Sequence, residues 1–302
     1  MNPTDAQLVS NSIQFLLSSF VNRLNQESAP PIEEFAHRVA KRDLFENVDE
    51  CLFGSLRYGE LAVVSGPDQD LVHDLVFSTA IDLACALKNP VVLISPAQSH
   101  FQILLKLLAN QSHISKAKLV EGDIKRSEWG CLVSALNNLQ KCELFVFNDE
   151  IGEIVELIKL LRHLNGLCGI GAVFVDCVDS LLPKLESSCF PRSVLSHMRS
   201  LSELTCEIGV PIVAGMPPYL DYRDKDLGLS KLDCIDPSGK VLEIADQLFL
   251  AHCSENNSSS LGKNDVEVIR IYSDSDPDIP TRSFLDYQSL SGSVTAKPFP
   301  ID

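Results

Sequence analysis

The sequence predicts an α/β fold with an open, mostly parallel β-sheet and antiparallel strands at one edge. The first observation is that, between residues 59 and 214, short apolar runs alternate with longer segments whose apolar residues recur at helical spacing. Uninterrupted runs of Val, Ile and Leu are typical of parallel strands that are buried on both faces. The second observation is that strand-like segments follow one another without a helix after residue 240, which indicates an antiparallel extension.

These patterns assign each element in order. The parallel strands are expected at 61–65, 91–95, 144–147, 172–176 and 211–214. The helices between them are expected at 71–87, 98–109, 127–140, 151–164 and 193–208. The antiparallel strands are expected at 247–251, 266–272 and 282–287. We therefore expect one domain over residues 46–290, followed by a flexible tail over 291–302 that begins to loosen at Ser289.

The N-terminal segment, residues 1–45, is expected to form a helical arm. Its apolar residues share one helix face: Val9, Ile13, Leu17, Phe20 and Leu24. A Pro pair at 30–31 ends this helix, and a second helix is expected from Ile32 to about Phe45. The arm is too short to build its own core, and its polar face is not basic, so a protein groove is favoured over a membrane surface.

The charge balance bears on the partners of the chain. Lys and Arg number 25 against 41 Asp and Glu, which gives a net charge of −16. Such a chain repels phosphate backbones, and we expect no DNA binding by the isolated chain. No apolar run is long enough to span a bilayer, and the N-terminus carries no secretory pattern, so a cytoplasmic location is expected.

The ten cysteines are scattered and form no C-x-x-C pair. Most have apolar neighbours in the sequence, as around Cys177 and Cys253. Free, buried thiols are therefore expected, rather than a disulfide framework or a zinc site.

The first strand ends in Gly66 and is followed by a helix, which is the setting of a phosphate-binding loop, G-x-x-x-x-G-K-[ST]. Gly66 fits the first position of that pattern. The later positions do not fit: Leu71 replaces the second Gly, Val72 the Lys and His73 the hydroxyl residue. From these residues alone, an ordinary strand–turn–helix is favoured.

The fourth strand ends in Asp176. An acidic residue at the carboxyl end of a central strand is the arrangement in which NTPases hold magnesium. From this residue alone a structural Asp is favoured.

The order and spacing of these segments resemble the C-terminal motor domain of the DnaB-type replicative helicases, which has a RecA-like P-loop NTPase fold. The resemblance runs from about Asp43 to Ser293. It is carried by five segments: 59–65, 89–95, 169–176, 208–214 and 243–251.

The resemblance implies that most catalytic positions of the family are lost. The phosphate-loop Lys and Thr fall on Val72 and His73, the catalytic Glu falls near Ala97, and the Gln that senses the γ-phosphate falls on Pro217. The Lys and Arg that reach into the neighbouring subunit's nucleotide fall near Tyr272 and Asp274. Only Asp176 remains, as the metal ligand if magnesium binds. We expect no cofactor and no metal; the alternative is ATP with magnesium.

The main hypothesis is a DnaB-like protein that has lost ATP hydrolysis and unwinding and acts as an interaction or scaffold subunit linked to DNA replication. Its partner would be a copy of itself, in a homo-oligomer, or an active helicase subunit. The alternative is an active 5'-3' ATP-dependent helicase whose cations come from other positions, such as Lys88, Lys240, Lys263, Arg270 or Arg282. A scaffold in an unrelated assembly is the third reading. The loop over 221–240 is near neutral, which is a poor match for DNA tracking.

Overall fold

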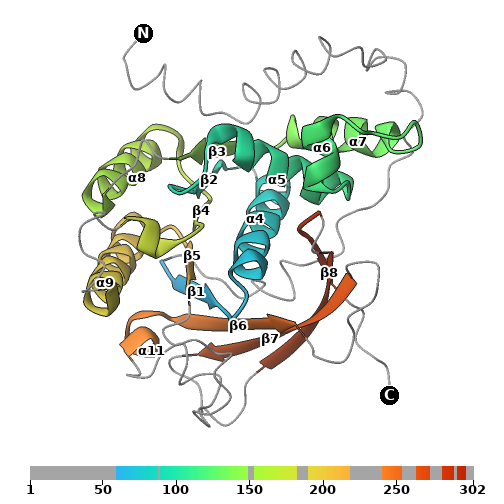
Figure 1. The fold of residues 1–302 in the computed structure, drawn as a ribbon. Helices are drawn as coiled ribbons and strands as arrows, with labels where there is room; N and C mark the ends of the chain where they lie inside the picture. Colours follow the sequence, from blue (N-terminus) through green and yellow to red (C-terminus); the bar gives the residue numbers. More distant parts are fainter. Residues whose placement is uncertain are drawn as a thin grey trace, which may run out of the picture.

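The computed structural model describes residues 59–87, 89–148, 153–181, 190–217, 240–253, 263–272, 281–288 and 291–296. Within them a nine-stranded sheet has the order β3-β2-β4-β5-β1-β6-β7-β8-β9 (Figure 1). The parallel part comprises β1 (Leu61–Ser65), β2 (Val91–Ile94), β3 (Leu144–Phe147), β4 (Ala172–Val175), β5 (Ile212–Met216) and β6 (Gln247–Cys253). The antiparallel part comprises β7 (Lys263–Tyr272), β8 (Thr281–Gln288) and β9 (Ser293–Ala296). The predicted fold class is confirmed, with one correction. The strand expected at 247–251 as part of the antiparallel extension is β6, which pairs in parallel with β1 and antiparallel with β7.

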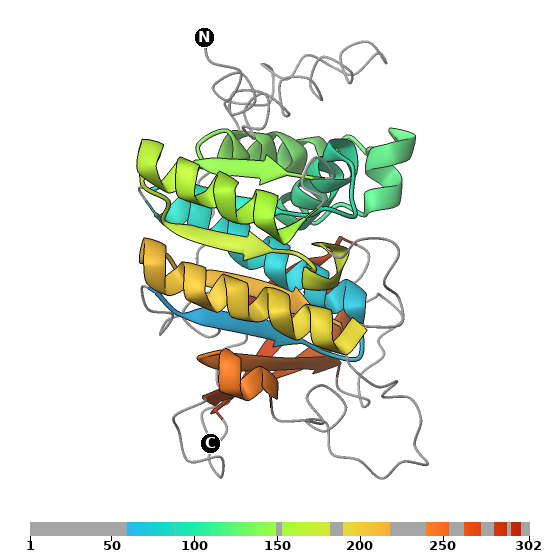
Figure 2. The same cartoon turned by 90° about the vertical axis from the view of Figure 1, so that its left-hand side faces the viewer.

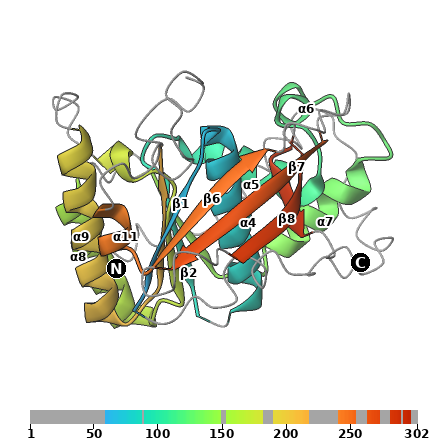
Figure 3. The same cartoon turned by 90° about the horizontal axis from the view of Figure 1, so that it is seen from below.

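Helices cover both faces of the sheet, as Figure 3 shows from below. One face carries α4 (Gln69–Ala86), α5 (His100–Ser112), α6 (Lys116–Glu121) and α7 (Trp129–Leu139). The other face carries α8 (Ile154–Cys168), α9 (Phe190–Ile208) and α11 (Lys240–Ile244), and α8 and α9 lie in front of the strands in Figure 2. Each face has its own apolar core, because every parallel strand sends alternate side chains to opposite sides.

The register of the strands brings the ends of β1, β2, β4 and β5 to one edge. Ile94 of β2 pairs with Val175 of β4, and Ser65 of β1 pairs with Met216 of β5. The residues that follow these strands therefore meet at this edge, which we call the carboxyl edge. In open α/β sheets, ligands bind at this edge.

The antiparallel strands curl back over α4 and α5 and are fastened there by polar contacts. Asp74 of α4, 3% exposed, accepts hydrogen bonds from the Tyr287 hydroxyl at 3.0 Å and from Lys116 Nζ at 3.2 Å. The Asn110 side chain donates to the Gly292 carbonyl at 2.8 Å. Gly292 has a positive φ of 71° and lies so close to the Asp74 carboxylate that a Cβ would meet it at 2.6 Å, so only glycine fits there.

Three expectations are corrected by the structure. The tail was expected to be flexible from residue 291, but Ser293–Ala296 forms β9, paired with β8, so the domain extends beyond residue 290. The helix α6 and a short 3₁₀ helix at Val178–Leu181 were not predicted. The cysteines were expected to be free and buried, but Cys85 and Cys142 form a disulfide, and Cys131, Cys168 and Cys206 are exposed.

Three expectations lie outside the described residues: the helical arm with Val9, Ile13, Leu17, Phe20 and Leu24, the loop over 221–239, and Asp274. None of the helices that the structure describes combines the length and the hydrophobicity that spanning a bilayer requires.

Burial of Asp74 predicts a pH dependence of stability. Loss of solvation raises the pKa of Asp74, although Lys116 and Lys106 act in the opposite direction. The native state thus keeps this proton at pH values where the unfolded chain has lost it, so Asp74 lowers stability as pH rises above the ordinary Asp range. We expect the free energy of unfolding of Asp74→Asn, relative to wild type, to rise between pH 4 and pH 7 in urea denaturation.

The exposed Asp123 offers a matched control, since Asp123→Asn makes the same substitution at a carboxylate that is not buried. A difference between Asp74→Asn and wild type that stays constant with pH, or grows in acid, would contradict this account.

Candidate functional site

The candidate site lies at the carboxyl edge, where β1 turns into α4. Only three residues separate Ser65, at the end of β1, from Gln69, where the helix begins, and Val72 N donates to the Asp68 carbonyl at 3.1 Å. The Asp68 side chain caps the helix by accepting from the backbone N–H of Asp70 at 3.0 Å and of Leu71 at 3.3 Å. In a phosphate-binding loop, such N–H groups point at the ligand. Here a carboxylate of the same chain already occupies two of them.

The position that the resemblance assigns to the phosphate-loop Lys is apolar and buried. Val72 is 4% exposed and belongs to the core between the sheet and α4. A methyl group built on Gly66 would lie 3.5 Å from one γ-carbon of Val72, and one built on Gly215 would lie 3.5 Å from the other. Val72 is therefore wedged between the backbones at the ends of β1 and β5. The neighbouring Leu71 is fully buried.

Asp176 follows β4 and is 1% exposed, and it accepts three side-chain hydrogen bonds. His73 Nδ1 lies 2.5 Å from Oδ1, while Ser95 Oγ and Gln98 Nε2 donate to Oδ2 at 2.6 Å and 3.1 Å. His73 comes from α4, and Ser95 and Gln98 follow β2. The strand order explains the meeting, because β2 and β4 are hydrogen-bonded neighbours and α4 crosses the sheet beside them. We call these four residues the Asp176 cluster.

The cluster satisfies the carboxylate without an external cation. A buried carboxylate is stable only when its lone pairs are paired, and three donors supply that pairing here. His73 stands at the position where the resemblance places the magnesium-binding hydroxyl, and its ring contacts Asp176 Oδ1.

Cys177, the next residue, is not an activated thiol. Burial raises its pKa well above the ordinary value, and the nearby carboxylates of Asp179 and Asp176 raise it further. The thiol donates to Asp179 Oδ1. It therefore stays protonated at neutral pH and is unsuited to act as a nucleophile.

The other predicted positions lie around or away from this cluster. Ala97 is exposed in the turn after β2, and Pro217 is buried directly after β5. Tyr272 ends β7 and pairs with Gln247 at the start of β6, so it lies at the opposite edge of the sheet from Asp176. In the parts of the chain that the structure describes, no group of three or more His, Cys, Asp and Glu residues could hold a metal ion.

Sequence reasoning missed Asp68, Ser95 and Gln98 as members of this arrangement. The N-cap role of Asp68 could have been predicted, since an Asp directly before a helical pattern is a common N-cap. Ser95 and Gln98 had none, because their role depends on which strands become neighbours.

Comparison with known proteins identifies the family of the chain. The model of the family described as the DnaB-like helicase C terminal domain matches residues 44–269. A probable replicative DNA helicase of Guillardia theta is 24% identical over 170 residues, which cover 56% of this chain and 28% of that protein. A probable plasmid replicative DNA helicase of Chlamydia trachomatis is 24% identical over 193 residues, which cover 63% of this chain and 43% of that protein. The chain thus spans less than half the length of these curated relatives.

Solved structures support the fold independently. A DnaB-like replicative helicase, described together with its interactions with primase, superimposes with a TM-score of 0.68 at 15% identity, over 80% of this chain and 58% of that one. Together, the order of strands, the Asp at the end of β4 and the match over three quarters of the sequence place the chain in the family of DnaB-like helicase C-terminal domains.

Proposed function

We propose that this chain is a DnaB-like protein that no longer hydrolyses ATP or unwinds DNA, and that it serves the replication machinery as an interaction subunit. The observation that carries the proposal is the Asp176 cluster, in which the carboxylate left for magnesium accepts hydrogen bonds from His73, Ser95 and Gln98. A metal at this place would have to displace His73 and rebuild these contacts.

The residues around the Asp176 cluster do not fit a magnesium triphosphate either. Val72 provides no cation and fills its space with a branched apolar side chain packed between two glycines. Asp68 places a carboxylate on the helix N-terminus that would receive the phosphates. Two like charges about 4 Å apart repel by about 4 kcal/mol at an effective dielectric of about 20, so Asp68 opposes the ligand as well as replacing it.

The interaction role rests on the family. One structural relative is described with its interactions with primase, and the apolar stripe expected on the N-terminal arm offers a docking face. The partner proposed for this chain is a second copy of itself or an active DnaB-like helicase. Size-exclusion chromatography with light scattering, of the chain alone and mixed with such a helicase, would detect either complex.

Calorimetric titration of the full chain with ATP and magnesium tests the proposal directly. We expect no heat of binding, while an active DnaB-like helicase in the same buffer gives a clear isotherm. A ligand present at about 100 times its dissociation constant stabilises a protein by about 2.7 kcal/mol, which for a domain of this size raises Tm by on the order of 5–10 °C. The thermal shift should be absent here as well.

The alternative is an ATP-dependent helicase with catalytic groups taken from other positions, which membership in the helicase family favours. It requires a micromolar dissociation constant and phosphate release that DNA stimulates and Asp176→Ala abolishes. Either result would overturn the proposal.

A further inference from the structure

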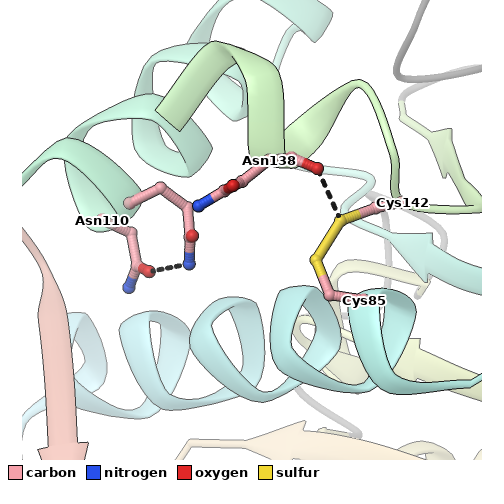
Figure 4. Close-up of a disulfide and its surroundings, with 5 residues drawn as sticks. Cys85, Asn110, Asn138 and Cys142 are labelled. Carbon is pink, nitrogen blue, oxygen red and sulfur yellow. Dashed lines mark hydrogen bonds between the residues drawn. A yellow bond between two sulfur atoms is a disulfide. The ribbon is translucent and has the colours of Figure 1, made fainter. Parts of the chain in front are cut away.

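The disulfide between Cys85 and Cys142 connects two elements that the fold itself brings together. Cys85 lies in the last turn of α4, and Cys142 lies in the turn between α7 and β3, 57 positions later (Figure 4). Their Cα atoms are 4.7 Å apart, within the range that a disulfide requires. Because α4 and α7 share the same apolar core, including Ala84 and Leu139, the two cysteines remain neighbours when the bond is open.

We propose that Cys85 and Cys142 form a reversible thiol–disulfide switch, closed by exchange with a low-molecular-weight disulfide such as oxidised glutathione. The inference does not depend on the proposed function, since it rests on the two cysteines and their surroundings alone. The Cys142 sulfur lies 3.3 Å from the Asn138 carbonyl oxygen in the closed form, so after reduction the Cys142 thiol can donate to this oxygen.

The two cysteines differ in exposure, and this difference determines which thiol reacts first with the glutathione disulfide. Cys142 is 1% exposed and belongs to the core, whereas Cys85 is partly exposed at the edge of the core. A glutathione disulfide can therefore reach Cys85 first. The Cys85 thiolate attacks one sulfur of oxidised glutathione, which releases one glutathione thiol and leaves a mixed disulfide.

The second step occurs inside the protein. The Cys142 thiolate attacks Cys85 Sγ, forms the internal disulfide and releases the second glutathione thiol. Two protein thiols lose two electrons and two protons, and one glutathione disulfide becomes two thiols. The exposed Cys131, Cys168 and Cys206 are free, so they can accept glutathione but lack the adjacent partner that Cys85 has in Cys142.

Closing the bond makes a covalent loop of the segment that contains β2, α5, α6 and α7. A disulfide stabilises chiefly by restricting the unfolded chain, and the effect grows with the length of the loop. The loop also contains Ser95 and Gln98, two of the three donors to Asp176. Oxidation therefore stabilises the segment that keeps the Asp176 cluster in place.

The test uses the full chain in anaerobic glutathione buffers of graded oxidised-to-reduced ratio. Free thiols are alkylated, and peptides are mapped without reduction, while Tm is measured in parallel. We expect a Cys85–Cys142 peptide that appears with oxidation, and a Tm that falls by on the order of 10 °C when dithiothreitol is added. Cys131→Ser should behave like wild type.

Two variants separate the steps. Cys142→Ser removes the resolving thiol, so a persistent glutathione adduct should accumulate on Cys85. Cys85→Ser should leave Cys142 unmodified in the folded protein and should abolish the redox dependence of Tm.

Three results would overturn the switch. The first is alkylation of both Cys85 and Cys142 in fully oxidised glutathione. The second is a wild-type Tm that does not change on reduction. The third is that Cys142 in the Cys85→Ser variant forms a glutathione adduct as fast as Cys85 does in the Cys142→Ser variant.

Discussion

Replacement of Asp176 by alanine should lower the free energy of unfolding by about 2–4 kcal/mol, although the residue stands at the position of a catalytic metal ligand. The reason is that Asp176 is the common acceptor for His73, Ser95 and Gln98. Alanine leaves these groups facing a buried gap without a partner, and a buried donor left unsatisfied costs about 1–3 kcal/mol. The measurement is the midpoint of urea denaturation, with the m-value unchanged.

Asp176→Asn serves as the isosteric comparison. Its amide oxygen can accept from Ser95 and Gln98, and its NH₂ group can donate to Nδ1 of a neutral His73 that carries its proton on Nε2. We therefore expect Asp176→Asn to cost less than about 1.5 kcal/mol. Asp123→Ala, at an exposed position, should leave stability unchanged.

The opposite result would point to a working site. Acidic groups kept for catalysis often reduce stability, and their removal then stabilises the fold. If Asp176→Ala proved as stable as wild type or more stable, the Asp176 cluster would not be the structural contact that we describe, and the active-helicase alternative would gain support.

The sheet could be predicted because its information is local. Each parallel strand is a short run of apolar residues, and the runs at 61–65, 144–147 and 172–176 agree with β1, β3 and β4 to within one residue. The strand β9, which was not predicted, depends on contacts that are distant in the sequence. Its segment, Ser293–Ala296, is only four residues long and is held by distant contacts, among them the bond from Asn110 to the Gly292 carbonyl.

The candidate site was predictable only in part, for a similar reason. The motif pattern singled out Asp176, Val72 and His73 one at a time. Their contacts depend on the strand order, in which β4 lies between β2 and β5 and so brings Ser95 beside Asp176. The Cys85–Cys142 disulfide depends likewise on how α4 packs against α7, and no local pattern records it.

Replacement of Gly215 or Gly66 by alanine should be the most damaging small change in the described part of the sheet, with a loss of on the order of 3–5 kcal/mol each. A Cβ on Gly215 would lie 2.1 Å from the backbone oxygen of Asp176, and one on Gly66 would lie 2.1 Å from that of Ala251. Both contacts are far closer than atoms can approach, and both involve backbone that neighbouring strands hold in place. The measurement is the urea midpoint, as for Asp176.

Gly130 and Gly166 supply the controls, because they lie in α7 and α8 and a Cβ on either would meet nothing within 4 Å. Gly130→Ala and Gly166→Ala should gain about 0.5–1 kcal/mol from better helix propensity.

A double variant identifies which atom causes the loss of stability in Gly215→Ala. The γ-carbons of Val72 lie 3.5 Å from the places that a Cβ on Gly66 or on Gly215 would occupy, which is ordinary contact, so Val72→Ala should not rescue Gly215→Ala. Rescue would show that the side chain, and not the carbonyl of Asp176, limits the space. The size of the Val72 side chain would then be what excludes a methyl group at position 215. Failure to rescue, with both controls stable, means that the strand backbones themselves close this edge and that Val72 fills only the space they leave.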